Sequence, residues 1–210
     1  YERMKSNGAQ FGVVNGWERP YYFAKENFDD EAARSFRRGG WWKYAVEEAQ
    51  AIRNNVGLID ATAFTKHLVQ GPGATKFIDW FTCNRIPRVG KINLTYALTK
   101  NGTTRSEYTI VRKSTNTYYL VSAGAWTDYD GDYLRKAAES KSSEFGYIEI
   151  HDCTNQWGVF AIAGPTSRAL IKSVINDHNK ASSLSNKRFP WLSYKNIEIG
   201  MCPVTAIRVA

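Results

Sequence analysis

The chain has 210 residues, of which 43% are hydrophobic, 14% aromatic and 23% charged, and it carries a formal net charge of +8. Such a composition suits a soluble globular protein with a sizeable core and excludes a disordered tail. No stretch approaches the roughly 18 uninterrupted apolar residues of a membrane-spanning helix, and residues 1–5 lack the apolar core of a signal peptide.

Residues 1–40 are rich in aromatic residues, glycine and charge, and glycines and a proline interrupt any regular period. This composition predicts an irregular packed arm. Residues 42–55 then place alanine, valine and isoleucine at helical spacing, and Gly57 follows where a left-handed residue ends a helix, so a helix is predicted. Residues 58–70 are predicted to be extended.

A glycine-proline junction at residues 71–73 separates that extended run from a second apolar helical face, which predicts a helix over residues 74–81. A three-stranded meander is then predicted over residues 93–98, 105–112 and 118–122. Its first turn contains Asn101 and Gly102, which tolerate the positive φ that tight hairpin turns require. The order so far is strand, glycine-proline, helix and meander.

The remaining pattern contains the same junction again. A helix is predicted over residues 127–140, strands over 147–152 and 158–163, and a helix over 166–175. The segment LVQGPGATKFI (residues 68–78) aligns with AIAGPTSRALI (residues 161–171) at an offset of 93 residues and keeps the glycine-proline pair and the apolar spacing. This match indicates a duplicated unit, although strand, glycine-proline, helix is also a generic junction.

The end of the chain is predicted to contain a polar loop over residues 176–186, a short aromatic turn at 189–191 and a last strand over 203–210. A final apolar strand with nothing after it would leave an unpaired sheet edge. The pattern therefore predicts that the chain is truncated.

The residues outside these patterns give mostly negative expectations. Cys83, Cys153 and Cys202 lie far apart and form no Cys-x-x-Cys pair, so we expect reduced, buried thiols without a disulfide framework or a zinc site. The three histidines have no metal-binding spacing, so no metal is expected. The basic residues are scattered without a nucleic-acid-binding motif, and a diffuse positive field suits a small anionic ligand equally well.

Four segments carry a family resemblance: GWERP (residues 16–20) with the aromatic residues after it, VGLIDAT (56–62), the glycine-proline pair at 164–165, and PVTAIR (203–208). Together they resemble the glycine-cleavage T-protein (aminomethyltransferase) family, and within it the folate domains of dimethylglycine and sarcosine dehydrogenases. The resemblance implies an α+β fold, a duplicated antiparallel-sheet-plus-helix folate-binding domain that is truncated at the C-terminus.

With the repeat, the resemblance divides the chain into an N-terminal arm (residues 1–40), a first T-protein-like subdomain (41–157) and the incomplete start of a second one (158–210). The family's Tyr-Thr-Gly-Glu motif, whose glutamate holds the pterin ring, is expected after residue 210.

The resemblance implies that Glu107 is the catalytic residue. In the family an acidic residue on the strand after the glycine-containing turn contacts the folate nitrogens, and Glu107 occupies that position in the segment LTKNGTTRSE. A carboxylate there can accept the proton released when the folate amine attacks a one-carbon unit. The alternative is an ordinary solvated glutamate on a strand.

The resemblance also implies seven residues that bind the substrate or folate: Asp60, Thr62, Phe64, Leu94, Ser122, Trp17 and Tyr22. Phe64 stands where the family has methionine and Leu94 where it has an aromatic residue, so these contacts are expected to differ. Asp60 can instead cap a turn, and Trp17 and Tyr22 can instead anchor the arm by packing.

The sequence as a whole predicts a tetrahydrofolate-dependent module that forms 5,10-methylenetetrahydrofolate from a one-carbon unit derived from a methylated amine. The resemblance implies FAD in an upstream flavin domain outside this chain, and no nucleic-acid or membrane partner. The expected location is the cytoplasm of a bacterium or the mitochondrial matrix of a eukaryote. Alternatives are a free-standing folate-dependent demethylase or methyltransferase, a non-catalytic folate-binding module, and a basic nucleic-acid-binding module.

Overall fold

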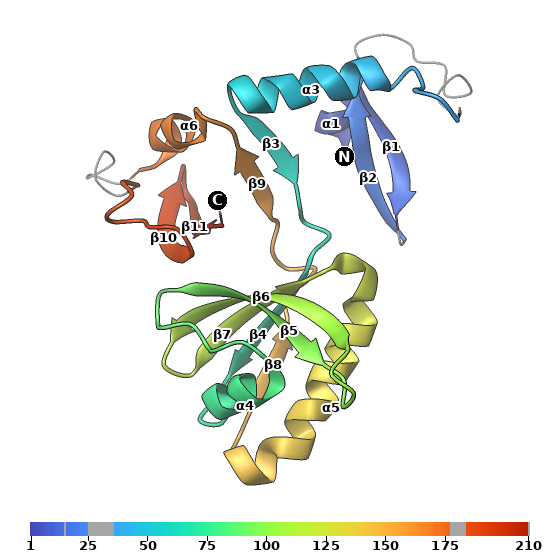
Figure 1. Cartoon of the computed structure of the whole chain (residues 1–210). Coiled ribbons are helices and arrows are strands. Elements are labelled where there is room, and N and C mark those ends of the chain that lie inside the picture. Colours follow the sequence, from blue (N-terminus) through green and yellow to red (C-terminus); the bar gives the residue numbers. More distant parts are fainter. Residues whose placement is uncertain (15, 25–35, 177–183, 210) are drawn as a thin grey trace. The chain divides into compact units, whose positions relative to one another are not determined.

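The chain folds into two compact units (Figure 1). The computed structural model describes residues 1–14, 16–24, 36–176 and 184–209. The first unit contains residues 1–59 and 160–170, and the second contains residues 60–159 and 171–210. The subdomain boundaries predicted at residues 40 and 157 stay predictions.

The first unit begins with a short helix and a hairpin, so the prediction of an irregular arm is wrong for residues 1–23. Helix α1 (Glu2–Ser6) leads into strands β1 (Ala9–Val14) and β2 (Trp17–Phe23), which pair antiparallel. The glycines that suggested irregularity lie where the backbone turns or another group comes close. Gly8 has φ +87°, and a Cβ there would lie 2.1 Å from the Ala24 carbonyl oxygen. Residues 15 and 25–35 of the predicted arm lie outside the described residues.

The predicted helix over residues 42–55 is confirmed as α3 (Trp42–Asn54). Its buried Tyr44 stacks on Tyr22 of β2, with ring centroids 6.1 Å apart, and the Glu48 carboxylate accepts a hydrogen bond from the Phe23 backbone at 2.8 Å. These contacts attach the helix to the hairpin.

Strands β3 (Gly57–Asp60) and β9 (Phe160–Ala163) form a separate two-stranded sheet.

The second unit is built on a five-stranded antiparallel sheet in the order β5-β6-β7-β4-β8. Its strands are β4 (Thr65–Gln70), β5 (Ile92–Leu98), β6 (Thr104–Ser114), β7 (Thr117–Ser122) and β8 (Glu149–Asp152). The predicted meander is confirmed as β5, β6 and β7. Gly102 in its first turn has φ +77°, as the Asn-Gly signal predicted.

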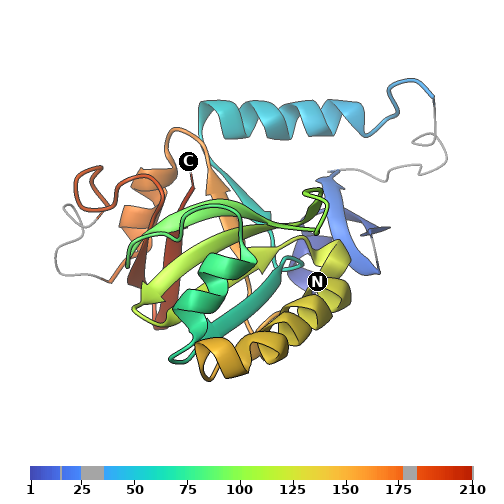
Figure 2. The ribbon, with the colours of Figure 1, turned by 60° about the horizontal axis from the view of Figure 1, so that its bottom comes forward.

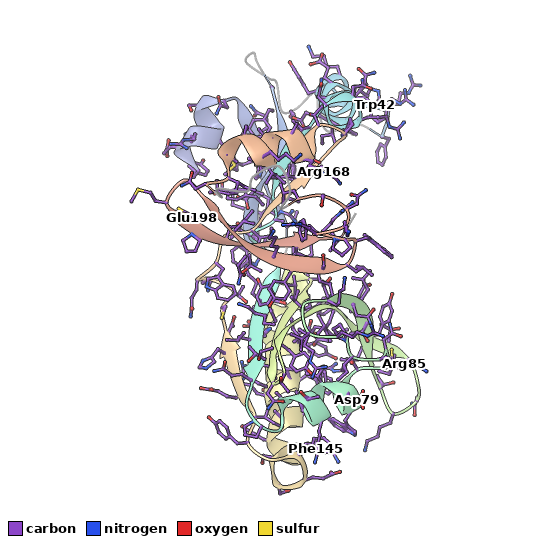
Figure 3. All side chains as sticks on the ribbon, turned by 90° about the vertical axis from the view of Figure 1, so that its left-hand side faces the viewer. Trp42, Asp79, Arg85, Phe145, Arg168 and Glu198 are labelled. Carbon is purple, nitrogen blue, oxygen red and sulfur yellow. The ribbon has the colours of Figure 1, made fainter. Side chains whose placement is uncertain are left out.

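Two helices, α4 (Ala74–Phe81) and α5 (Thr127–Phe145), cover one face of this sheet (Figure 2). A one-turn 3-10 helix, η1 (Gly124–Trp126), precedes α5. Figure 3 labels Asp79 on α4 and Phe145 near the end of α5, and the ring centroids of Trp80 and Phe145 lie 6.3 Å apart. The main core lies between the helices and the sheet, and includes Val69, Phe77, Ile78, Tyr108, Ile110, Tyr118, Leu120 and Leu134. We call the face of the sheet that α4 and α5 cover the helix face.

The opposite face, here called the open face, is partly covered by a hairpin of β10 (Ser193–Ile199) and β11 (Cys202–Arg208). A second apolar cluster joins Ile92, Val111 and Tyr119 of the sheet to Leu192, Tyr194 and Ile207. The predicted last strand is confirmed as β11. β11 pairs with β10 along its whole length, and within the described residues no strand pairs with its other edge.

The two glycine-proline junctions adopt the same local structure. Gly71 and Gly164 have φ of +117° and +122°, and the helices that follow them, α4 and α6 (Ser167–Val174), have eight residues each. The Ala74 amide donates to the Gly71 carbonyl at 3.0 Å, and the Ser167 amide to the Gly164 carbonyl at 3.1 Å. Both glycines lie where a side chain would meet a backbone carbonyl oxygen. The two junctions therefore share one local structure, and the duplication of a larger unit stays a prediction.

All three cysteines are free, but only Cys153 is buried. The prediction of buried thiols is wrong for Cys83, which follows α4 in an exposed loop, and for Cys202, which is exposed at the start of β11. Among the described residues, no helix has the length and apolar character needed to cross a membrane.

Candidate active site

Glu107 lies on the open face of the five-stranded sheet. Its neighbours along β6, Ser106 and Tyr108, are buried on the helix face, whereas the Glu107 side chain is exposed. Because successive side chains of a strand point to opposite faces, Glu107 points away from α4 and α5. Within the described part of the chain, no hydrogen bond or ion pair engages its carboxylate. The carboxylate is therefore available to a ligand.

A β-bulge places Glu107 on that face. Leu98 pairs with Thr104, but Ala97 pairs with Ser106, so Arg105 is an extra residue in β6. If β6 had no bulge, the pairing of Leu98 with Thr104 would continue residue by residue. Ser106 would then lie opposite Tyr96 on the open face, and the Glu107 side chain would point toward the helices. The Arg105 guanidinium lies 3.7 Å and 4.1 Å from the ring centroids of Tyr129 and Tyr133 on α5.

The predicted contact residue Leu94 shares the open face with Glu107. Leu94 pairs with Thr109 on β6, and Glu107 pairs with Tyr96, so Leu94 and Glu107 are diagonal neighbours on adjacent strands. The Leu94 side chain is 49% exposed. The structure therefore brings together two of the residues that the sequence predicted.

Asp60, Thr62 and Phe64 lie together in the segment between β3 and β4. The Asp60 carboxylate accepts a hydrogen bond from the Thr62 amide at 2.9 Å, which is the turn-capping role considered as an alternative. The Thr62 hydroxyl accepts a hydrogen bond from the Val159 amide at 3.1 Å. Phe64 is exposed at the end of this turn. The polar residues thus fix the backbone, and the phenyl ring is left accessible.

This segment also lies close to the residue that follows β7 opposite Glu107. Thr109 of β6 pairs with Val121 of β7. Continuing this antiparallel register by two residues sets Ala123, which has an extended backbone, opposite Glu107. At the next residue, Gly124, a Cβ would lie 1.8 Å from the Ala63 carbonyl oxygen. Only glycine permits this approach, which brings the turn before Phe64 to the end of β7.

Lys66 is a buried charged residue that no sequence motif indicates. Its ammonium donates hydrogen bonds to the carbonyl oxygens of Thr62 and Phe64, each at 2.7 Å, and of Thr154 at 2.9 Å. Burial lowers the pKa of Lys66 below its ordinary value, and the carboxylates of Asp152 and Asp60 act in the opposite direction. A lysine on a strand gives no sequence signal for such a role, since most strand lysines are exposed.

Ser122 lies on the helix face, opposite to Glu107. Its hydroxyl donates to the buried Asp130 carboxylate at 2.9 Å and contacts the Thr65 hydroxyl at 2.5 Å. Ser106 donates to the other oxygen of Asp130. Ser122 is therefore part of a buried hydrogen-bond network on the helix face of the sheet.

The same layer contains two buried polar side chains without partners. Among the described residues, both ring nitrogens of His67 and the Tyr108 hydroxyl have no hydrogen-bond partner. Burial lowers the pKa of His67 and raises the pKa of Tyr108. Both groups are therefore held in their neutral forms near neutral pH.

Trp17 and Tyr22 belong to the first unit. Tyr22 is buried and stacks on Tyr44, so the packing alternative describes its surroundings. Trp17 is half-buried and pairs with Val14 next to the hairpin turn. Within the described residues, no group of three or more histidine, cysteine, aspartate or glutamate side chains is arranged to hold a metal ion.

Comparisons with known proteins identify relatives across the whole chain. The family described as the GCVT N-terminal domain matches residues 1–210. Mitochondrial dimethylglycine dehydrogenase of Mus musculus is 31% identical over 211 residues, which cover 100% of this chain and 23% of that protein. Sarcosine oxidase subunit alpha of Rhizobium meliloti is 26% identical over 203 residues, which cover 95% of this chain and 19% of that protein. The chain thus spans less than a quarter of the length of either relative.

The fold has a counterpart among solved structures. Glycine cleavage system aminomethyltransferase T from Bartonella henselae superposes with a TM-score of 0.68 at 18% identity, covering 94% of this chain and 46% of that one. The predicted family resemblance and the predicted α+β fold with antiparallel sheets are both confirmed.

Proposed function

Because this chain belongs to the GCVT N-terminal domain family and is related to dimethylglycine dehydrogenases, we propose that it binds tetrahydrofolate and forms 5,10-methylenetetrahydrofolate. The single observation that carries the proposal is the unpaired, exposed carboxylate of Glu107 on the open face of the sheet. An acceptor held there, beside apolar side chains, fits a flat ring system that carries N–H donors.

Glu107 is proposed to act as the general base. Tetrahydrofolate would supply the amine nitrogens that accept the one-carbon unit. Glu107 would accept the proton that the attacking nitrogen loses as the new carbon–nitrogen bond forms, and would return a proton to the departing amine or hydroxide. Its exposure allows this exchange with solvent once the ligand has left.

The other predicted residues take supporting roles in this proposal. Leu94 and Phe64, which are both exposed, would contact the ligand. Asp60 and Thr62 would hold the backbone of the segment that carries Phe64. Ser122 would fix the end of β7 from the helix face, and Trp17 and Tyr22 would stabilise the first unit by packing.

The one-carbon donor is proposed to be a methylated amine such as dimethylglycine or sarcosine, oxidised by a flavin domain outside this chain. The proposal is supported by the names of two relatives, dimethylglycine dehydrogenase and sarcosine oxidase. FAD would belong to that domain and would make no contact that the mechanism of Glu107 requires. The mitochondrial relative supports a mitochondrial matrix location for a eukaryotic protein of this kind.

The first test is Glu107→Gln in the intact protein. We expect this change to lower the rate of 5,10-methylenetetrahydrofolate formation by about a hundredfold or more, because the amide cannot accept the proton. Oxidation of the amine, followed with an artificial electron acceptor, should be unaffected. Glu198→Gln is the matched control, since Glu198 is also an exposed glutamate on a strand (Figure 3). Unchanged folate-dependent transfer in Glu107→Gln would contradict the catalytic role.

A further inference from the structure

Three apolar side chains project from β5 onto the open face beside Glu107. Leu94, Tyr96 and Leu98 are 49%, 38% and 39% exposed, whereas Thr95 and Ala97 between them are buried on the helix face. We call Leu94, Tyr96 and Leu98 the β5 strip. Contiguous exposed apolar side chains form a candidate surface for a ligand or a partner.

The β10–β11 hairpin leaves the β5 strip uncovered. The hairpin and the residue before it pack on the open face at Ile92, Val111 and Tyr119, and that apolar cluster does not include the strip. The outer edge of β5 is already occupied, because the Cys83 amide donates to the Tyr96 carbonyl at 2.9 Å and the Asn84 side chain to the Leu94 carbonyl at 2.7 Å. The side chains of the strip, rather than its backbone edge, are therefore what β5 presents to a ligand.

Tyr96 is the cross-strand partner of Glu107. Side chains directly opposite each other in an antiparallel pair have Cβ atoms about 4.5–5.5 Å apart, so the phenol ring and the carboxylate are immediate neighbours on one face. An apolar protein surface that covered the strip would also bury this carboxylate without a partner, which is strongly unfavourable. A planar heterocycle with N–H donors avoids that penalty, since its face can lie on the ring while its edge donates to the carboxylate.

We propose that Tyr96 is a ligand-positioning residue, whose ring packs against the ring system of tetrahydrofolate while Leu94 and Leu98 flank it and Glu107 accepts from an N–H. This inference rests on the proposed function and adds a division of roles. Tyr96 determines how tightly the folate is held, and Glu107 determines how fast the carbon is transferred. The bulge at Arg105 creates the arrangement, because it sets Glu107 rather than Ser106 beside the ring.

The test compares Tyr96→Ala, Tyr96→Val and Tyr96→Phe in the intact protein, with tetrahydrofolate as the ligand in a calorimetric titration and in steady-state kinetics. Stacking on an aromatic side chain contributes to the binding free energy of a ring system. We therefore expect Tyr96→Ala to raise Kd and KM for tetrahydrofolate about tenfold, with kcat changed by less than about twofold. Tyr96→Phe keeps the ring and should bind like the wild type. Tyr96→Val removes the ring but suits a strand, so it gives the same answer if the alanine variant does not fold.

Tyr147→Ala is the matched control, because Tyr147 is an exposed tyrosine of the same unit outside the β5 strip. Folate binding as tight as that of the wild type in a folded Tyr96→Ala or Tyr96→Val protein would overturn the role of Tyr96 and leave the proposed function standing. A loss in Tyr96→Phe equal to that in Tyr96→Ala would also overturn it, because the hydroxyl rather than the ring would then matter. If the wild type itself binds no tetrahydrofolate, the proposed function fails and this inference fails with it.

Discussion

Lys66 shows how a single charged side chain can hold a segment in place. Its ammonium satisfies carbonyl oxygens on both sides of β4, at Thr62 and Phe64 on one chain segment and at Thr154 on another. The Lys66 side chain is fully buried; its hydrogen bond to Thr154 is buried as well, whereas those to Thr62 and Phe64 are partly buried. The position of Phe64 therefore depends on a residue that contacts no ligand.

We expect Lys66→Met to lower the free energy of unfolding by roughly 1–3 kcal/mol, because three carbonyl oxygens lose a shared donor and the buried one, of Thr154, is left without a partner. Urea unfolding followed by circular dichroism measures the change. Lys136→Met is the control, since Lys136 is an exposed helix residue paired with Asp132 at 2.8 Å, and its loss should change stability by less than about 0.5 kcal/mol. Equal stability of the Lys66→Met protein and the wild type would show that water replaces the ammonium.

At the scale of the elements, the bulge in β6 decides which side chains face the ligand. Arg105 is the extra residue, and its guanidinium is held between two tyrosines of α5. Contacts of a cation with aromatic rings at partly exposed sites contribute about 0.5–2 kcal/mol. The contact with α5 therefore favours the pairing in which Glu107, and not Ser106, lies on the open face.

Arg105→Ala should weaken that pairing. We expect faster hydrogen exchange of the amides shared by β5 and β6, and slower folate-dependent transfer, with little change in exchange between β4 and β8. Mass spectrometry of exchanged peptides provides the measurement, and the β4–β8 peptides are the internal control. Arg105→Lys should recover little of the effect, because an ammonium lacks the planar surface that stacks on two rings. Unaltered exchange at β5–β6 in Arg105→Ala would mean that the turn alone fixes the register.

The regular elements were predictable where one periodicity dominated. Alternation over the meander and helical spacing over residues 42–55 and 74–81 gave β5, β6, β7, α3 and α4. The N-terminal hairpin was not predicted because its glycines, which allow close approach, are the residues that usually interrupt structure. Strand β10 was missed because its apolar residues Tyr194, Ile197 and Ile199 do not alternate regularly with polar ones. The bulge at Arg105 has no local signature, so the cross-strand partner of Glu107 was beyond prediction.

The same distinction applies to the candidate site. The family motif was sufficient to select Glu107 and Leu94, because that information is carried along the chain. Lys66 and Tyr96 were missed because their roles depend on which strands pair and in what register. Ser122 was selected by its place in the chain, but whether its side chain points to the helix face or the open face depends on its burial against Asp130.

At the scale of the whole molecule, the two glycine-proline junctions and the helices after them have the same backbone conformation but differ in packing. Ala74, Phe77, Ile78 and Phe81 are all buried in α4, whereas none of the residues of α6 is buried. The local sequence thus determines the junction and the helix, and the surrounding elements determine how far the apolar side chains are covered.

The stability of the second unit should depend on pH through His67. Burial lowers the pKa of His67 in the folded state, while Asp152 and Asp130 act against this and Arg135 adds to it. The unfolded chain, with an ordinary pKa of about 6.5, then binds the proton more readily than the folded one. Stability is therefore fully present above about pH 6.5 and is lost as pH falls below that value toward the lower folded pKa.

We expect the free energy of unfolding to fall between about pH 7 and 5 with a slope of at most about 1.4 kcal/mol per pH unit from this group. His67→Gln removes the titrating ring, so its unfolding should show a smaller slope over the same interval, measured by urea titrations at several pH values. A slope identical to that of the wild type would assign the pH dependence to other groups.

The edges of the five-stranded sheet have a consequence for how the protein can be joined to others. On one side, Cys83 and Asn84 already occupy the backbone of β5. On the other, β8 has only four residues and carries Glu149 and His151, which contact each other at 2.8 Å. Short, charged or occupied edges resist the addition of strands from another chain. We therefore expect a strand added by a fusion partner or linker to pair poorly with either edge of this sheet, so that such a partner contacts the sheet through side-chain surfaces.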